Sequence, residues 1–403
     1  MPTFVIAGAS LAGAKAAETL RDEGFDGEIV LLGTELERPY ERPPLSKGYL
    51  LGNEPRDVIY VHSGDWYAEH GVDFRPGVTV TAIDRATATV VASGAGGTEE
   101  LAYDKLLLTT GASPRKLNFP GSDRDEVLYL RTVQDSERLR TAFKPGTRVV
   151  VAGAGWIGLE ATAAARLAEC PVTVLEPQPG ALQAQLGPEL GGVFADLHRS
   201  HGVEFRFGES AAEFRPGLVI TSSGAQLEAD VLVVGIGAAP NDQLAARAGL
   251  EVSNGVLTDE ALRTSDQNIY AAGDVANSFN PLLGYRVRVE HWANALNGGP
   301  AAARSMLGQP VVYDRVPYFY SDQYDLGMEC AGLPSPGTYD QVAYRGNRAT
   351  LEFIAFWLSR GVVVAGMNVN VWDVNDDIQA LIRSGAQVDV DRLTNADIPL
   401  TAL

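Results

Sequence analysis

Cysteine is nearly absent from this chain of 403 residues, which has only two, Cys170 and Cys330. They lie far apart, and the sequence has no CxxC or CxxxxC pair. Zinc fingers, cysteine-ligated iron–sulfur clusters and a redox-active disulfide are therefore excluded as simple interpretations. Two isolated thiols are typical of buried cysteines in a reducing compartment, which predicts a cytoplasmic protein.

Positive charge is scarce as well. The 32 Lys and Arg residues face 51 Asp and Glu residues, giving a formal net charge of -19. Because so acidic a surface repels nucleic acid and anionic membranes, we expect neither as a partner. The most apolar stretch, 149–168, is broken by glycines and by Glu160, which indicates a strand, a turn and a helix, not a membrane span. The strand-like FVIAG at 4–8 leaves no basic segment for a signal peptide.

Catalytic signatures built on histidine or serine are also missing. The chain has five histidines, and His62, His70, His198 and His201 lack the spacing of a metal site or a nucleophilic triad. There is no GxSxG serine motif. We therefore predict no metal site and no hydrolase. The length alone predicts two or three domains.

The chain does have an internal similarity. FVIAGASLAGAKAAETL near the start and VVVAGAGWIGLEATAAA from residue 149 each run from a β-branched strand through small residues into an Ala-rich helix. Each half continues with a second strand ending near an acid, Glu35 or Glu176, then a hairpin pattern. Each closes with an apolar strand and a glycine turn, at 106–112 and 231–238. Two such βαβ units predict an α/β fold with two Rossmann-type parallel sheets.

The pattern of predicted strands and helices changes after Pro317. Strands at LEFIAFWL and GVVVAGMNV and a helix beginning near Val374 predict a separate α+β domain. A strand ending in YAAGDVA at 270–276 would return the chain to the first sheet. We therefore expect a discontinuous first domain, 1–114 and 241–316, a second domain, 115–240, and a C-terminal α+β domain, 317–403.

The second glycine loop, GAGWIG at 153–158, is a complete GxGxxG between a strand and a helix. Its glycines allow the tight turn, the approach of backbone to a pyrophosphate, and close helix packing, and the helix N-terminus attracts the phosphates. Glu176 would accept hydrogen bonds from ribose hydroxyls, whereas a 2′-phosphate there would cost about 4 kcal/mol per charge pair at ~4 Å and an effective dielectric of ~20. No basic residue follows in PQPGALQAQLG, so we predict a preference for NADH. The predicted contacts are Gly153, Gly155, Trp156, Ile157, Gly158 and Glu176.

The first loop, GASLAG at 8–13, has Ser10 in place of the middle glycine. Serine is small and its hydroxyl can donate to a phosphate, so dinucleotide binding is still expected. The alternative is that this half has lost its ligand. The predicted contacts are Gly8, Ser10, Leu11, Ala12, Gly13 and Glu35.

Five further segments carry a family resemblance. They are PYERPPLSKGYL at 39–50, TTGASPR at 109–115, YAAGDVA at 270–276, RVEHWANA at 288–295 and PYFYSDQYDLGME at 317–329. In this order they resemble the bacterial NADH-dependent ferredoxin reductases of cytochrome P450 and aromatic-ring dioxygenase systems, to which apoptosis-inducing factor is related. The resemblance covers essentially the whole chain and departs from the family pattern at Ser10, Thr34 and Tyr320.

The resemblance implies a glutathione-reductase-like fold with a C-terminal interface domain. FAD would occupy the first domain and NADH the second, with Glu35 at the adenosine ribose and Asp274 at the ribityl chain. Further cofactor contacts implied by the matching segments are Arg42, Lys47, Thr110, Gly111, Ala112, Arg115, Gly273, Glu290, His291, Trp292 and Tyr320. The glycine turn that closes the second half is expected to add Gly235, Ile236 and Gly237.

Three residues are expected to act in catalysis: Lys47, Glu160 and Trp292. Lys47 is one of five lysines, and an ammonium beside the flavin favours the anionic reduced form. The resemblance implies that Glu160 pairs with it, the alternative being an acid on a solvated helix face. Trp156 would cover the flavin, or else pack in the protein interior.

We expect hydride to pass from NADH to FAD, and single electrons to pass on to a [2Fe-2S] ferredoxin. Docking would use a local basic patch, for which the candidates are Arg286, Arg288, Arg304, Arg315, Arg345 and Arg348. An NADH-sensing redox switch like apoptosis-inducing factor, and an NADH:quinone or oxygen oxidoreductase, remain alternatives. The resemblance implies a monomer or a homodimer.

Overall fold

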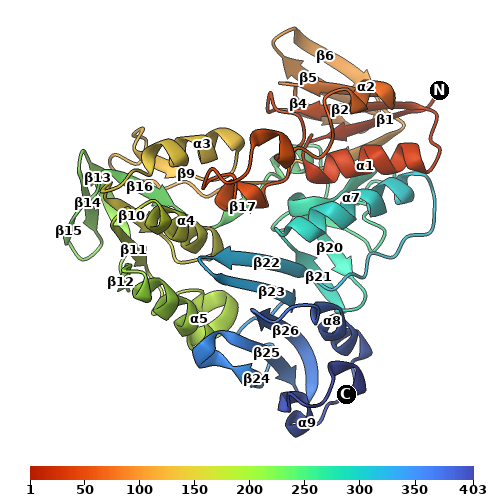
Figure 1. The fold of residues 1–403 in the computed structure, drawn as a ribbon. Coiled ribbons are helices and arrows are strands. Elements are labelled where there is room, and N and C mark those ends of the chain that lie inside the picture. Colours follow the sequence, from red (N-terminus) through yellow and green to blue (C-terminus); the bar gives the residue numbers. More distant parts are fainter. The chain divides into compact units, whose positions relative to one another are not determined.

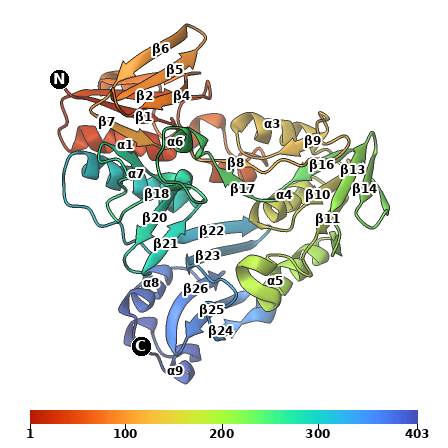
Figure 2. The same cartoon turned by 180° about the vertical axis from the view of Figure 1, so that it is seen from behind.

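The computed structural model describes all of residues 1–403 and divides into two compact units (Figures 1 and 2). The first unit comprises 1–41, 56–113 and 238–317, and the second comprises 42–55, 114–237 and 318–403. The segment 42–55, which carries Lys47, was expected in the first domain but is grouped with the second unit. The C-terminal region joins that unit as well.

The first unit is built on a parallel sheet of five strands in the order β19-β7-β1-β2-β3. Its central strand β1 is buried from Phe4 to Ala7, as its unbroken apolar sequence predicts. The bounds are β1 Thr3–Ala7, β2 Glu28–Gly33, β3 Val72–Pro76, β7 Lys105–Leu108 and β19 Ile269–Ala271.

Helix α1 (Leu11–Asp22) packs against helix α7 (Trp292–Met306), which lies beside it in both views (Figures 1 and 2). A Cβ at Gly299 would overlap the carbonyl oxygen of Ala12, so the two backbones touch. The Ala- and Gly-rich sequences of both helices permit this approach. The pair anchors the N-terminus of α1 at the sheet.

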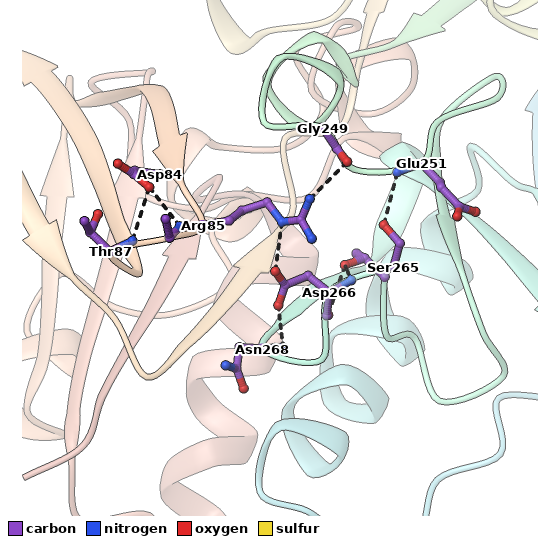
Figure 3. A network of polar contacts seen from close by, with 10 residues as sticks. Asp84, Arg85, Thr87, Gly249, Glu251, Ser265, Asp266 and Asn268 are labelled. Atoms are coloured by element: carbon purple, nitrogen blue, oxygen red, sulfur yellow. Dashed lines mark hydrogen bonds and ion pairs between the residues drawn. The ribbon is translucent and has the colours of Figure 1, made fainter.

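The first unit also contains an antiparallel sheet of β4, β5 and β6 and a second three-stranded sheet in the order β18-β20-β21. Arg85, in the turn after β4, donates to Asp266 at 2.8 Å and to the carbonyl of Gly249 at 3.1 Å (Figure 3). Asp266 in turn accepts from the backbone of Asn268 just before β19. This network ties the hairpin to the parallel sheet. The other elements of the unit are η2 Arg56–Ile59, α2 Trp66–Glu69, β4 Thr79–Asp84, β5 Thr89–Gly94, β6 Gly97–Ala102, β8 Ala112–Pro114, β17 Ala238–Pro240, α6 Gln243–Arg247, β18 Val256–Thr258, η3 Gly273–Val275, β20 Ala276–Asn280 and β21 Tyr285–Arg288.

The second unit repeats the design with a parallel sheet in the order β12-β11-β10-β16-β9. A small antiparallel sheet, β13-β14-β15, forms where the sequence predicted a hairpin. The bounds are η1 Pro43–Ser46, β9 Val127–Tyr129, α3 Val133–Ala142, β10 Val149–Ala152, α4 Trp156–Leu167, β11 Val172–Glu176, α5 Gln183–Ser200, β12 Glu204–Phe207, β13 Ala211–Arg215, β14 Leu218–Thr221, β15 Gln226–Glu228 and β16 Val231–Val234.

The C-terminal part of this unit is an antiparallel sheet, β22-β23-β26-β25-β24, with helices α8 and α9 (Figure 2). One continuous core runs from this sheet, through Phe353 and Trp357, to Phe194 of α5 and to β10. The bounds are β22 Tyr318–Gln323, β23 Leu326–Gly332, β24 Gln341–Asn347, η4 Arg348–Thr350, β25 Glu352–Ser359, β26 Val362–Val369, α8 Asn375–Ser384, α9 Val390–Thr394 and η5 Leu400–Ala402.

The α/β fold class predicted from the sequence is confirmed, with two parallel sheets and a C-terminal α+β part. No helix combines the length and the apolar character that crossing a bilayer requires. No three His, Cys, Asp or Glu side chains are grouped so that they could share a metal ion.

Candidate functional site

The carboxyl ends of four parallel strands meet at one edge of the first sheet. Ala7 of β1 pairs with Leu32 of β2 and Leu108 of β7, and Leu108 pairs with Ala271 of β19. The residues that come after these strands therefore lie side by side. They include the predicted contacts Gly8, Glu35, Thr110 and Gly273.

The loop after β1 leaves backbone donors for an anion. Gly8 has φ 125°, and a Cβ there would overlap the carbonyl oxygen of Thr109. A Cβ at Gly13 would overlap the carbonyl oxygen of Gly8, so both ends of the loop require glycine. Ser10 is the N-cap of α1, and its side chain makes no capping hydrogen bond. The first N–H groups of α1 and the Ser10 hydroxyl thus suit a phosphate.

Two further predicted contact regions follow β2 and β7, at Glu35 and at Thr110. Glu35 accepts from the hydroxyl of Tyr40 at 2.6 Å and is half-buried just beyond β2, the position of a ribose ligand. Thr110 is held by Asn241, whose side chain donates to the Thr110 carbonyl at 2.8 Å. Gly111 comes next with φ 69°, a left-handed conformation that lets the chain turn into Ala112.

Charged and aromatic side chains lie together near the N-terminus of α7, among them His291 and Trp292. Burial lowers the pKa of His291 to about 4, against the opposing charge of Asp274. Burial also raises the pKa of Glu41, which is opposed by a hydrogen bond from Trp292 and by the charge of Lys15. At neutral pH His291 is therefore neutral. Glu290 pairs with Arg288.

The second loop has the same backbone construction. Gly153 has φ 102°, and a Cβ there would overlap the carbonyl oxygen of Gly235. A Cβ at Gly158 would overlap the carbonyl of Gly153, whereas one at Gly155 would come no closer than 4.0 Å to Gly235. The middle glycine thus faces open space at the N-terminus of α4, as a pyrophosphate requires. Ile157 and Ile236 are both exposed beside it.

Glu176 organises this loop from the end of β11. One of its oxygens accepts from the backbone N–H of Ala154 at 2.8 Å, and the other accepts from Gln178 at 2.9 Å. A carboxylate has further acceptor sites but no donor, so it suits ribose hydroxyls and disfavours a phosphate. Gly237, with φ 93°, accepts from the backbone N–H of the exposed Arg115 at 2.9 Å.

Lys47 and Glu160 form a buried ion pair in the second unit. Lys47 Nζ lies 2.8 Å from Glu160 Oε2, and the Glu160 side chain is only 4% exposed. Ser46 also donates to Oε2, and Ser321 donates to Oε1 at 2.6 Å. Lys47 lies over the ring of Tyr320, 5.3 Å from its centroid. The solvated helix face considered for Glu160 is therefore wrong.

Trp156 lies in an aromatic cluster of the second unit. Its ring is 5.3 Å from that of Phe194 and 5.1 Å from that of Phe319, both at steep angles. This is the interior packing considered as an alternative for Trp156. Arg42, at the other end of its segment, donates to the carbonyl of Arg131.

Sequence reasoning missed Ser46, Ser321 and Glu41. Each lies within a segment used for the family resemblance and next to a residue that was chosen. Serine is too common in loops and strands for its type alone to indicate a role. Only the fold shows that two serine hydroxyls converge on one buried carboxylate.

Residues 2–299 match the pyridine nucleotide-disulphide oxidoreductase family, and residues 318–403 match a reductase C-terminal domain. The ferredoxin–NAD(+) reductase component of the anthranilate 1,2-dioxygenase system of Burkholderia cepacia is 39% identical, over 98% of each chain. Putidaredoxin reductase of Pseudomonas putida is 35% identical over 98% of this chain and 95% of its own.

Solved structures agree with these relatives. The putidaredoxin reductase of a covalent complex with putidaredoxin superposes with a TM-score of 0.95 at 34% identity, covering 99% of this chain and 97% of that one. The ferredoxin reductase of the CYP199A2 system from Rhodopseudomonas palustris gives 0.94 at 33% identity, covering 100% and 99%. The resemblance inferred from the sequence is thus confirmed, and FAD and NADH are the cofactors that it implies. The chain belongs to the pyridine nucleotide-disulphide oxidoreductase family.

Proposed function

We propose that this chain is an FAD-containing, NADH-dependent reductase of a [2Fe-2S] ferredoxin that serves a P450 or a ring-hydroxylating oxygenase. The observation that carries the proposal is the buried Lys47–Glu160 pair, which brings together the PPLSK segment and the helix of the NADH loop. The full-length similarity to reductases of this kind supports it.

The cofactors supply the redox chemistry: FAD when bound takes a hydride from NADH and releases two electrons singly. The protein binds and orients. In our proposal the loop at 8–13 and Glu35 hold FAD, and the loop at 153–158 and Glu176 hold NADH. Lys47 supplies a fixed positive charge, and Glu160 keeps that ammonium in place.

The acceptor is external in this proposal. Burial raises the pKa of both thiols, Cys170 and Cys330, so neither is poised to act as a thiolate. A cytoplasmic location, consistent with these buried thiols, is part of the same proposal.

The arginines considered for ferredoxin docking are mostly engaged within the chain. Arg288, Arg304 and Arg348 form ion pairs with glutamates. Arg286 and Arg345 donate to backbone carbonyls. Arg315 is exposed. A ferredoxin that docked on these six arginines would therefore meet less net positive charge than their number suggests. We expect ferredoxin binding to weaken only modestly as the salt concentration rises.

The test is anaerobic bleaching of the yellow protein by NADH and by NADPH, followed by addition of a [2Fe-2S] ferredoxin. We expect NADH to bleach the flavin far faster and ferredoxin to restore the colour. Bleaching without recovery by ferredoxin would favour the redox switch, and recovery by quinone or oxygen alone would favour the oxidoreductase alternative. A colourless protein that takes up no FAD would contradict the proposal.

A further inference from the structure

A continuous chain of buried hydrogen bonds leads away from Glu160 within the second unit. Ser321 donates to Glu160, and the Gln323 amide nitrogen lies 3.1 Å from Ser321 Oγ. The Gln323 carbonyl oxygen lies 2.8 Å from Nε2 of His198, whose Nδ1 lies 3.0 Å from the hydroxyl of Tyr324. The chain joins helix α4, strand β22 and helix α5.

The fold explains how these groups meet. Ser321 and Gln323 are two residues apart in β22, so their side chains point to the same face. Ser321, Gln323 and His198 are each at most 1% exposed and lie where an apolar core surrounds α5. Polar groups this deeply buried are costly unless every member is satisfied, and here each has a partner.

The direction of each hydrogen bond in this series follows from Glu160, which stands at its end. Ionised Glu160 can only accept, so Ser321 must donate to it and must itself accept from Gln323. The amide of Gln323 then presents its oxygen to His198, which requires a proton on Nε2. His198 is therefore neutral with Nδ1 accepting from Tyr324, in agreement with burial that lowers its pKa to about 4.

Tyr324, at the other end of the hydrogen-bond series, has a strained backbone conformation. Tyr324 has φ 58°, a left-handed conformation that a tyrosine seldom adopts. Its ring stacks on His201, with centroids 3.7 Å apart and planes 6° apart, while its hydroxyl meets His198. These contacts hold the turn between β22 and β23 in a geometry that aims the Tyr324 hydroxyl at the histidine.

We propose that Ser321, Gln323 and His198 are positioning residues, which hold the Glu160 carboxylate in one orientation and, through it, the Lys47 ammonium. This inference rests on the proposed function of the Lys47–Glu160 pair. The chain is not a proton relay, because an amide such as Gln323 neither takes up nor releases a proton near neutral pH. Its effect is to set the direction of one hydroxyl group.

The charged groups around Glu160 make this effect measurable. The Lys47 ammonium lies 2.8 Å from the carboxylate. Asp322, on the opposite face of β22, adds a like charge, and Glu329, which pairs with Tyr320 between β22 and β23, adds another beside Asp322. Loss of the Ser321 hydroxyl removes a donor to the anion. The carboxylate, and with it the Lys47 ammonium, is then held by fewer contacts.

The experiment uses the full-length, FAD-loaded protein and the variant Ser321→Ala, without ferredoxin. The rate of bleaching by NADH and the flavin midpoint potential are both measured against pH. We expect the rate curve to be displaced downward by about tenfold, since one hydrogen bond to a charged group is lost. The potential curve should be displaced to more negative values, because the ammonium that favours the anionic reduced flavin is held less firmly. The matched control is Ser305→Ala, a serine of α7 that is 3% exposed and does not contact Glu160, and its curves should overlay the wild type.

A second pair of variants tests His198, which lies farther from Glu160 in the hydrogen-bond series. His198→Gln keeps a donor near the position of Nε2, whereas His198→Leu does not. We expect a smaller displacement in the same direction for leucine and near wild-type curves for glutamine. If Ser321→Ala does not fold, this pair decides: equal curves for leucine, glutamine and wild type would overturn the inference.

The two proposals fail differently. Wild-type protein that is never bleached by NADH would overturn the proposed function, yet a difference in midpoint potential between wild type and Ser321→Ala would still report on the hydrogen-bond chain. Normal bleaching with superimposable Ser321→Ala and wild-type curves would overturn the positioning role alone.

Discussion

The two glycine loops share a strand–loop–helix construction but differ in how the first turn of the helix is packed. In the first loop the helix begins with Leu11, Ala12 and Gly13, all buried, and α1 packs backbone to backbone on α7. In the second loop, Trp156 is half-buried and Ile157 is 45% exposed. The first loop is thus enclosed within its unit, and the second presents side chains to solvent.

This difference matches the two ligands that we propose. A flavin that stays through every turnover suits a loop whose helix start is buried against its neighbours. A nicotinamide that enters and leaves suits a loop with an open side. The acids that follow the second strands also differ in their partners. Glu35 accepts a hydrogen bond from the side chain of Tyr40, whereas Glu176 accepts one from a backbone N–H of its own glycine loop.

The largest expected effect comes from the enclosed loop. Gly8→Ala would drive a Cβ into the Thr109 carbonyl and require φ 125° of a non-glycine residue. We expect a loss of more than about 3 kcal/mol in the free energy of unfolding, with loss of FAD. Thermal unfolding and flavin absorbance measure both.

Gly24→Ala is the matched control, because Gly24 has φ 79° but no atom within 4 Å of the added Cβ. It should cost only about 1–2 kcal/mol, the intrinsic cost of the left-handed conformation. Equal losses for the two variants would show that the enclosure of the first loop contributes nothing.

Acid should destabilise both units through one histidine each. The pKa of His291 in the first unit and that of His198 in the second are both lowered to about 4 by burial. The folded state thus binds fewer protons than the unfolded state, so this stability is present above pH 6.5 and is lost as pH falls toward 4. The loss is about 3 kcal/mol for each histidine.

Urea unfolding of the holoprotein at pH 7 and pH 5 measures the part of this loss that falls between the two pH values, about 2 kcal/mol for each histidine. His198→Gln cannot take up the proton in either state, so its stability should fall less between the two pH values. An unchanged difference would mean that carboxylates, and not His198, dominate the acid response of the second unit.

The third prediction concerns the acid of the open loop. Glu176→Ser removes the charge opposed to a 2′-phosphate, so we expect the preference for NADH over NADPH to fall about tenfold or more. Steady-state kinetics with each nucleotide measures the ratio. Glu35→Ser, the equivalent change in the first unit, should weaken FAD retention and leave that ratio unchanged, and a shifted ratio there would contradict the assignment of the two loops.

The sequence could predict the elements that repeat a strong local pattern. Both glycine loops, the second strands that precede Glu35 and end at Glu176, and the C-terminal strands follow from runs of apolar residues and from glycine placement. The predicted start of a helix near Val374 agrees with α8, which begins at Asn375. Such signals are local, so no knowledge of the fold is needed to find them.

The sequence could not predict which unit holds Lys47, or which groups surround Glu160. The segment 42–55 is grouped with the second unit through contacts such as Ser136 to the Leu45 carbonyl, which join residues far apart in the chain. Histidine spacing likewise gave no sign of His198, because its partners Gln323 and Tyr324 lie in another part of the chain. Tertiary contacts of this kind leave no periodic trace in a sequence.

The smallest effect should come from the residue by which the two loops differ most plainly. If the Ser10 hydroxyl donates to a phosphate of FAD, Ser10→Ala loses one hydrogen bond worth about 0.5–1.5 kcal/mol and weakens FAD binding roughly three- to tenfold. Titration of the cofactor-free protein with FAD measures this. Because Ser10 has φ -119° and makes no capping hydrogen bond, the change should leave the helix intact. Ser10→Gly restores the glycine found at position 155 but not the hydroxyl, so it should bind FAD as weakly as alanine. Binding tighter than wild type would mean that the side chain obstructs the loop, and that the first loop is a weakened copy of the second.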